Sequence, residues 1–295
     1  AIMELPFRWA EHACTAATPC RGIFPRTFHV LWPTRELTFG GHKTEEREAR
    51  TSVARLKELQ PEWAVRVWTD SDCEALMVEA MPGRMPLYRA LAPKLKQFDA
   101  IRTLILHVHG GIYLDLDVLC TRPLAPLVLG SPTTALFLRA DWPRQNVEYR
   151  SILNMTHRVV ASGNHIMGSI ARHPLWLYYL DIIFDGQACP APTKSECEGS
   201  VIMHTGNGAL ERAVFAFLAN HPKQRPSLRL LGERAFLNES QYRGQRRNVY
   251  ADGQLVCRHL HSLSPVESQP GGDDDTKGQL KRSARHNAHE RRQSV

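Results

Sequence analysis

The sequence lacks the long hydrophobic runs and cysteine pairs that define several large protein classes. No apolar stretch in its 295 residues reaches the roughly 18 residues that a membrane-spanning helix needs. The longest candidate, residues 175–184, is short and contains Asp181. None of the seven cysteines forms a CxxC pair, which argues against a structural zinc site. We also find no internal repeat.

The composition is that of a globular protein. Hydrophobic residues make up 43% and charged residues 23%, which excludes collagen, low-complexity fibres and wholesale disorder. At about 150 residues per domain, the length allows one large domain or two small ones. The 37 Lys and Arg exceed the 30 Asp and Glu by seven, and a basic balance suits an anionic partner such as a phosphorylated small molecule or a membrane surface. No nucleic-acid-binding module is recognised, so nucleic acid is discounted.

The cysteines leave the redox compartment open. Cys14 and Cys20 are close enough in sequence to form a local bridge, as are Cys189 and Cys197, and the sequence favours neither outcome. Cys120 follows an apolar run, and we interpret it as core packing.

The two ends of the chain differ in character from its middle. Residues 1–22 lack periodicity and form an N-terminal extension, whereas residues 23–264 carry the patterns of a folded domain. Residues 265–295 are polar and nearly free of large apolar side chains, so we expect a disordered tail. Because the chain opens without a methionine, we expect a piece of a longer product, with any anchor or targeting segment outside it.

Strand and helix patterns alternate from residue 23 onward. Strands are predicted over 23–32, 64–68 and 112–114, helices over 45–59, from the capping run 69–72 to Ala80 and over 93–108, and a Pro/Gly loop over 81–86. This order implies βαβ crossovers, a mainly parallel sheet and an α/β fold. Ligands of such sheets bind beyond the carboxyl ends of strands, and Asp70 and Asp115 both lie at such ends.

Residues 97–124 carry the chemistry. Asp115 and Asp117 follow a buried strand at i, i+2, where two carboxylates can hold one hard divalent ion with open positions. Mg²⁺ and Mn²⁺ favour such oxygen ligands and complete their shells with phosphate oxygens. Upstream, Asp99 and Arg102 share one helix face at i, i+3. Arg102 offers a planar donor fork to phosphate or carboxylate, while Asp99 can accept from ribose hydroxyls or pair with Arg102.

Each motif alone has a simpler explanation. A bare DxD is usually a solvated turn, and a D-x-x-R pair is more often a surface ion pair. Here they occur in order, separated by a helix, the Gly110-Gly111 break and an apolar strand, and this combination is far more specific.

Several histidines and aromatic residues are predicted to be structural. His29 alternates with apolar residues on a strand, which is typical of a buried, hydrogen-bonded histidine. His107 and His109 face apart at a helix end, so a metal pair is not favoured. The aromatic residues assigned to the core are Trp63, Trp68, Trp176, Tyr178 and Tyr179.

The sequence DxxR, then GGIYLDLDV, then Pro-Leu resembles the DXD-containing sugar transferases of glycosyltransferase family 32. That group includes inositol-phosphoceramide mannosyltransferases and initiating α-mannosyltransferases. Further segments also resemble the family, although each one alone is weaker evidence. They are residues 23–32, 61–70, 164–174, 205–210 and 259–264.

The resemblance implies a GT-A fold, with a Rossmann-like, mainly parallel sheet and flanking helices. It implies an enzyme that transfers a hexose, with retention, from a nucleotide-sugar to a glycan, glycolipid or protein acceptor. GDP-mannose is favoured over a UDP-hexose by family habit, and Mn²⁺ or Mg²⁺ is the expected cofactor.

The resemblance also assigns roles to residues. Trp32 would stack on the nucleobase, and Asp99 and Arg102 would contact the donor's ribose and sugar. Asp115 would support the ribose or a metal-bound water, and Asp117 would bind the metal directly. These are the expected catalytic, donor-binding and metal-binding residues of the DxxR and DXD motifs.

Three more residues complete the implied site. Asn164 would lie near the donor sugar, and His259 or Ser264 would close the site on the metal or the diphosphate. The sequence departs from the family at Asn207, where the family has Pro, and at two positions of the closing motif, 261 and 265, where it tends to have Trp.

Two alternatives stay open. The altered closing motif is compatible with a sugar-nucleotide-binding protein of the same fold that has lost turnover. The run LDLDVLCT also matches the nucleophile loop of haloacid-dehalogenase-type phosphatases, but that loop follows a first strand and needs later acidic residues in the core.

Two glycosylation sequons begin at Asn154 and Asn238, although such triplets arise often by chance. Together with the possible bridges and the family, they favour a Golgi-type secretory lumen, with a membrane anchor outside this chain. A cytoplasmic location is the alternative.

Overall fold

The computed structural model of the chain describes residues 22–129, 136–140, 162–185, 201–221, 223, 228–231, 236–238 and 256–259. Several predictions fall outside these residues: the N-terminal extension up to residue 21, the tail over 265–295, the cysteine pairs Cys14/Cys20 and Cys189/Cys197, the sequon at Asn154, and Ser264.

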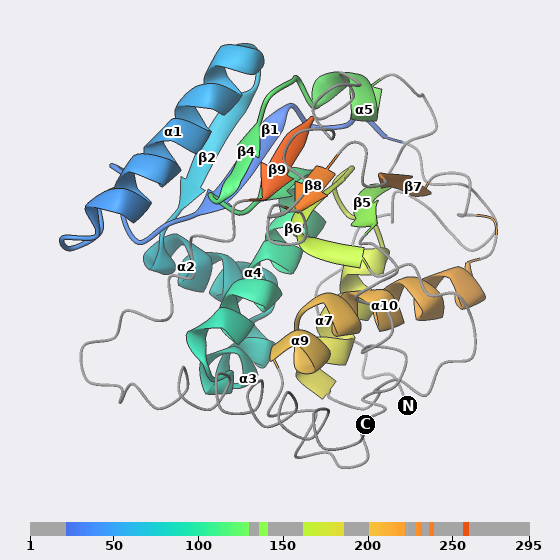
Figure 1. Cartoon of the computed structure of the whole chain (residues 1–295). Helices are drawn as coiled ribbons and strands as arrows, with labels where there is room; N and C mark the ends of the chain where they lie inside the picture. The colour runs from blue at the N-terminus through green and yellow to red at the C-terminus, as the bar shows by residue number, and fades with distance from the viewer. Residues whose placement is uncertain are drawn as a thin grey trace, which may run out of the picture. The chain divides into compact units, whose positions relative to one another are not determined.

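Six strands of the described residues form one sheet. In spatial order they are β2 (Ala64–Trp68), β1 (Thr27–Leu31), β3 (Gly111–Leu114), β6 (Ser162–Ser169), β5 (Leu136–Ala140) and β7 (Leu228–Leu231). β1 runs parallel to β2 and β3, and β5 runs parallel to β7, whereas β6 is antiparallel to both of its neighbours. The predicted α/β fold with a mainly parallel sheet is confirmed (Figure 1).

A second sheet of three short strands carries the segment after the DXD motif. Its order is β4 (Val118–Cys120), β9 (Cys257–His259) and β8 (Phe236–Asn238). β4 pairs antiparallel with β9, and β9 pairs parallel with β8. Residues near 120 and near 257 are therefore neighbours.

The helices agree with the predicted pattern except at one loop. They are α1 (Lys43–Leu59), α2 (Asp70–Ala80), α3 (Met85–Ala90), α4 (Lys94–His109), α5 (Ala125–Leu129), α7 (Leu175–Asp185), α9 (Val201–His204) and α10 (Asn207–Asn220). The predicted loop over 81–86 is wrong, because a 3-10 turn (Pro82–Arg84) and the start of α3 occupy it. The strand predicted over 23–32 is also shorter, and only Thr27–Leu31 pairs. No helix among the described residues has the length and apolar character to cross a membrane.

Local sequence signals set the ends of two helices. Thr69 begins α2 with a capping box, in which its hydroxyl accepts from the Asp72 N–H while its own N–H donates to the Asp72 carboxylate. Gly110 and Gly111 end α4 with φ values of 63° and 85°. A Cβ on Gly111 would lie 2.5 Å from the Thr27 carbonyl oxygen, so glycine allows β3 to start directly beside β1.

The core lies on both faces of the sheet. Ile112 and Leu114 of β3 belong to a cluster that includes Leu56 of α1, whereas Tyr113 between them belongs to a cluster with Ile101 of α4. Alternate side chains of β3 thus enter opposite layers, which explains its unbroken apolar sequence. The predicted core aromatic residues lie in these two clusters or against them.

His29 of β1 connects β2 with the turn between α4 and β3. Its Nδ1 accepts from the Trp68 indole N–H at 3.0 Å, so the proton is on Nε2, which donates to the Gly110 carbonyl at 2.9 Å. The prediction of a buried, hydrogen-bonded histidine is confirmed. Burial, with the neighbouring His109 as a second cause, lowers the pKa of His29 from 6.5 to about 3.

The depressed pKa of His29 predicts an acid-labile fold. A neutral His29 stabilises the protein fully above pH 6.5, and this stability is lost as the pH falls from there toward 3. We expect His29 alone to reduce the free energy of unfolding by about 2 kcal/mol between pH 7 and pH 5. Urea titrations at both pH values measure this loss. In His29→Gln the difference between the two pH values should shrink by that amount, and an unchanged difference would contradict the assignment.

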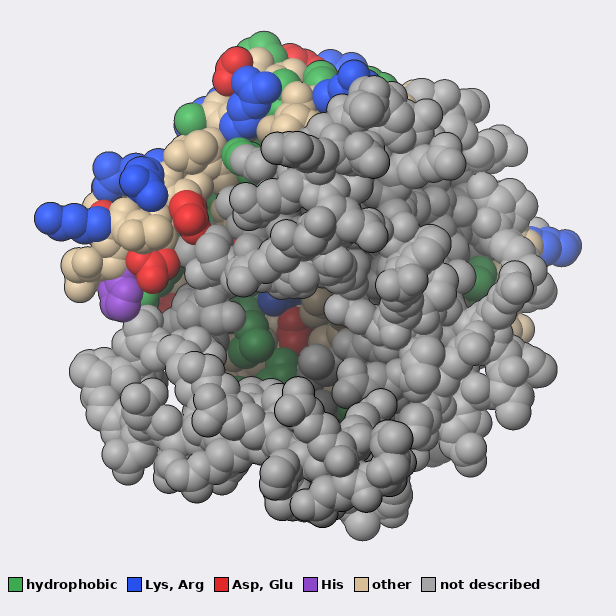
Figure 2. Space-filling view, viewed as in Figure 1, with side chains coloured by type: hydrophobic (Ala, Val, Ile, Leu, Met, Phe, Trp, Pro, Cys, Tyr) green, Lys and Arg blue, Asp and Glu red, His purple; other side chains and the backbone are tan. Residues whose placement is uncertain are grey.

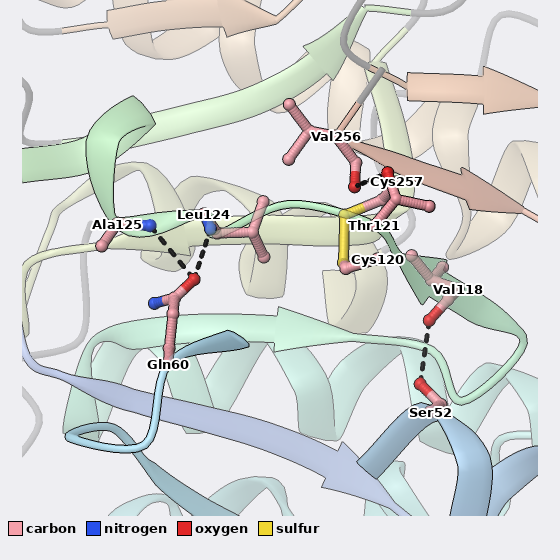
Figure 3. The surroundings of a disulfide bond; sticks show 9 residues. All are labelled: Ser52, Gln60, Val118, Cys120, Thr121, Leu124, Ala125, Val256 and Cys257. Carbon is pink, nitrogen blue, oxygen red and sulfur yellow. Dashed lines mark hydrogen bonds between the residues drawn. A yellow bond between two sulfur atoms is a disulfide. The ribbon is translucent and has the colours of Figure 1, made fainter. Parts of the chain in front are cut away.

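A disulfide joins two neighbouring strands of the small sheet, the edge strand β4 and the central strand β9. Cys120 and Cys257 are bonded across β4 and β9. The prediction that Cys120 packs in the core is confirmed, whereas its bond to Cys257 was not predicted. Figure 3 shows hydrogen bonds around the bridge: the Ser52 hydroxyl donates to the Val118 carbonyl at 2.9 Å, and the Thr121 hydroxyl donates to the Val256 carbonyl at 3.2 Å. The bridge and these contacts connect α1, β4 and β9.

Loss of the disulfide should destabilise the whole domain. It joins residues 137 positions apart, so it restricts the unfolded chain strongly, and Cys120→Ala is expected to lower the free energy of unfolding by about 2–5 kcal/mol. Urea unfolding with and without dithiothreitol measures this. Cys73→Ala, at a buried free cysteine, is the control and should keep its sensitivity to the reductant. A wild type that unfolds identically with and without reductant would refute the bridge.

Candidate active site

The predicted DxxR pair is formed and buried. Asp99 and Arg102 lie one turn apart on α4, and an Arg102 Nη2 lies 3.1 Å from an Asp99 carboxylate oxygen. Both residues are at most 4% exposed, so the alternative of a surface ion pair is wrong. A buried pair of this kind must meet further hydrogen-bonding partners, since each ion has given up its water.

Asp115 supplies the second carboxylate around Arg102. It follows the end of β3, and its oxygens lie 3.3 and 3.4 Å from Arg102 Nη1. The Tyr113 hydroxyl, two residues earlier, donates to Asp115 at 2.6 Å. Arg102 therefore connects the carboxylate of α4 with the carboxylate at the end of β3.

Residues from β6 and from the segment before α10 complete the arrangement. The Asn164 side-chain amide donates to Asp99 Oδ1 at 2.8 Å, and Arg102 donates to the Asn164 carbonyl at 3.1 Å. The Thr205 hydroxyl donates to Asp99 Oδ2 at 2.6 Å. Sequence reasoning missed Thr205 and Tyr113 as site residues, although Thr205 opens the segment that resembles the family over 205–210.

Charge and burial fix the protonation states of this group. Burial raises the pKa of Asp99, and the opposing effects of Arg102, Thr205 and Asn164 only reduce the rise. Burial lowers the pKa of Arg102, but the charge of Asp115, followed by Tyr113 and Asp99, outweighs it and the pKa is raised. Burial also raises the pKa of Tyr113. Arg102 is therefore a permanent cation and Tyr113 a neutral donor.

The DXD carboxylates lie in the turn between β3 and β4. The Val118 N–H donates to the Asp115 carbonyl at 3.0 Å and closes the turn. The Asp115 side chain is 29% exposed, while Asp117 is buried. Leu116 between them packs in the core, so the turn is not a solvated loop and its two carboxylates lie in different surroundings.

The backbone places His259 opposite the residue that follows Asp117. Val118, directly after Asp117, is the cross-strand partner of His259 in β9. As residue types, the carboxylate of Asp117 and the imidazole of His259 suit Mn²⁺, and their binding of the ion stays a prediction. Asp115 is bound by Tyr113 and Arg102. Among the side chains that the structure describes, no group of three or more His, Cys, Asp or Glu is placed to hold a metal.

Trp32 lies at the same edge of the sheet. It follows β1, and the register that pairs His29 with Tyr113 puts it beside the end of β3. Its indole N–H donates to the Thr38 carbonyl at 3.2 Å, and Phe39 packs edge-on against its ring. Trp32 is only 5% exposed, and its stacking on a nucleobase stays a prediction.

Charged and hydrophobic side chains of described residues lie together near the centre of the view in Figure 2, where red, blue and green atoms are neighbours. Buried carboxylates beside a fixed guanidinium can bind a polar ligand with hydroxyl and phosphate groups.

Comparisons with known proteins support the resemblance to the DXD-containing sugar transferases. The profile of the family described as "Glycosyltransferase sugar-binding region containing DXD motif" matches residues 46–134, which include the DxxR and DXD residues. Inositol phosphoceramide mannosyltransferase 1 of Schizosaccharomyces pombe is 28% identical over 169 residues, which cover 52% of this chain and 50% of that protein. Mannosyl phosphorylinositol ceramide synthase CSH1 of Saccharomyces cerevisiae is 31% identical over 155 residues, covering 52% and 34%.

The chain spans half or less of the length of these curated relatives. Among solved structures, an active-site mutant of LgtC aligns with a TM-score of 0.45 and 9% identity, over 81% of this chain and 88% of that one. The PaToxG glycosyltransferase aligns with a TM-score of 0.44 and 12% identity, over 66% and 70%. The sequence similarities confirm the predicted resemblance to the DXD-containing sugar transferases.

The contact between Thr205 and Asp99 gives a first test of the site. Thr205→Val keeps the side-chain shape but removes a donor from a buried carboxylate, and we expect the free energy of unfolding to fall by about 1–3 kcal/mol. Thr205→Ser keeps the hydroxyl and should retain most of the stability. Urea unfolding of the three proteins measures this, and a loss of stability in Thr205→Ser as large as that in Thr205→Val would contradict a dominant role of the hydrogen bond.

Proposed function

We propose that this chain is a metal-dependent, retaining glycosyltransferase that moves a hexose from a nucleotide-sugar to a glycan, glycolipid or protein acceptor. The observation that carries the proposal is the buried Asp99–Arg102 pair and its contact with the partly exposed Asp115, inside the region that matches the DXD family profile. Because the similar curated proteins are named as mannosyltransferases, GDP-mannose is the favoured donor and a UDP-hexose the alternative.

Asp99 and Asp115 differ in their hydrogen bonds and exposure, and we assign them different roles in donor binding. Both Asp99 oxygens already accept hydrogen bonds, from Asn164 and Thr205, and Asp99 is 2% exposed. Asp99 therefore orients Arg102 and Asn164 toward the donor. Asp115, whose side chain is 29% exposed, is the carboxylate that a ribose or sugar hydroxyl can reach.

Asp117 and His259 would hold the divalent ion, with Mn²⁺ favoured over Mg²⁺. Bound there, the ion supplies positive charge that stabilises the diphosphate leaving group. Arg102, held by Asp99 and Asp115, contributes a fixed positive charge near the same developing charge. Transfer then proceeds through an oxocarbenium-like transition state.

No side chain is assigned as a general base. For a retaining transfer we propose that the departing phosphate oxygen accepts the proton of the acceptor hydroxyl. The bond from the anomeric carbon to the phosphate breaks, the bond to the acceptor oxygen forms on the same face, and the proton moves to the phosphate.

The proposed setting is a Golgi-type secretory lumen, with a membrane anchor outside this chain. The Cys120–Cys257 disulfide supports it, because such bonds persist in oxidising compartments and are rare in the cytosol. The phosphatase alternative gains no support, because the DXD turn follows the third strand in chain order and Asp115 is bound by Arg102 and Tyr113.

Hydrolysis of nucleotide-sugars tests the proposal. With Mn²⁺ and a panel of GDP- and UDP-hexoses, we expect nucleotide release from one donor, abolished by EDTA. Asp117→Asn should reduce the rate at least about 100-fold, because it removes a charged oxygen ligand where diphosphate charge develops. Asp70→Asn is the matched control, since Asp70 also follows a strand but is exposed and paired only with Lys94 among the described residues, at 3.5 Å.

The other outcomes separate the alternatives. Metal-dependent binding of GDP or UDP with no hydrolysis, even when acceptors are added, would favour the sugar-nucleotide-binding protein without turnover. Neither binding nor hydrolysis would refute the donor-site assignment. An equal loss of activity in Asp70→Asn and Asp117→Asn would remove the support for Asp117 as the metal ligand.

A further inference from the structure

Strand β6 is irregular at the point where it enters the candidate site. Its ladder with β5 pairs Met167 with Leu138 and then jumps to Gly163 with Arg139. Residues 164–166 therefore have no register partner in β5. Bulged strands leave backbone groups that other partners must satisfy, and they are frequent beside active sites.

At Asn164, side chains take over the role of the neighbouring strand. Its N–H donates to the Asn207 side-chain oxygen at 2.9 Å, and its carbonyl accepts from Arg102 at 3.1 Å. Its own side chain donates to Asp99 at 2.8 Å. The placement of Asn164 in the site thus depends on a residue 43 positions away in α10.

Asn207 has no evident role in stabilising helix α10. It is the first residue of α10, where proline is favoured and where asparagine is a poor helix former. The preceding Gly206 makes no side-chain cap. The Asn207 side-chain oxygen instead accepts from the bulge of β6.

We infer that Asn207 is a positioning residue for the nucleotide-sugar and acts through Asn164. By holding the Asn164 backbone, it aims the Asn164 amide at Asp99 and the Asn164 carbonyl at Arg102. The contact couples α10 to the DxxR pair of α4 without Asn207 touching the donor. This inference rests on the proposed function for its ligand, but the contact itself can be tested without one.

Hydrogen exchange tests the contact in the ligand-free protein. In Asn207→Ala the Asn164 amide loses its acceptor, so its residue-resolved protection should fall about tenfold. Asn207→Asp keeps an oxygen at the same place and should restore protection. Asn220→Ala is the matched control, because Asn220 lies at the other end of α10 and, among the residues that the structure describes, its side chain donates only to Ala216 of the same helix. Unchanged protection in Asn207→Ala would overturn the contact.

Titration with GDP-mannose and with UDP-glucose, each with Mn²⁺, tests the role. We expect the Kd of the donor that the wild type binds to rise about 3- to 10-fold in Asn207→Ala and to return within about 2-fold of wild type in Asn207→Asp. A Kd that stays unchanged while protection falls would overturn the positioning role. If the wild type binds neither sugar, the proposed function and the donor role fall together, whereas the exchange result still decides the contact.

Discussion

The buried charge of Arg102 is the constraint on which the rest of the site depends. A guanidinium removed from water is tolerated only when its donors meet acceptors, and here they come from three elements: Asp99 of α4, Asp115 at the end of β3 and the Asn164 carbonyl of β6. Each of these acceptors is held in turn, by Thr205, Tyr113 and Asn207. Satisfying one cation thus fixes where helix α4 and strands β3 and β6 lie relative to one another.

The sheet explains why this cation lies where it does. β3 is buried on both faces, so it admits no polar side chain except the Tyr113 hydroxyl until the strand ends at Leu114. Polar side chains therefore lie at the carboxyl edge of the sheet. The Gly110-Gly111 turn reverses the chain between α4 and β3, so that Asp99 and Arg102 of α4 lie at this same edge. Ligand sites of open α/β sheets form at this edge for the same reason.

Features that depend on neighbouring residues could be predicted from the sequence, and features that depend on distant ones could not. The pairing of Asp99 with Arg102 follows from i, i+3 spacing, and the start of α2 follows from its capping residues. The bond from Thr205 to Asp99 spans 106 positions and the disulfide spans 137, distances over which no local pattern carries information. The loop predicted over 81–86 failed differently: its prolines occupy first-turn positions, where a helix needs no N–H donor.

The second sheet fixes the end of the DXD turn that follows Asp117. One side of the turn is held by Tyr113 and Arg102 on Asp115, and the other by Ser52 on the Val118 carbonyl and by the disulfide two residues beyond Val118. A turn held at both ends loses little conformational entropy when a ligand binds, so more of the interaction energy is available for affinity. The same bridge places β9, and with it His259, opposite Val118. The disulfide therefore holds the metal end of the proposed site, whereas Tyr113 and Arg102 hold its other end.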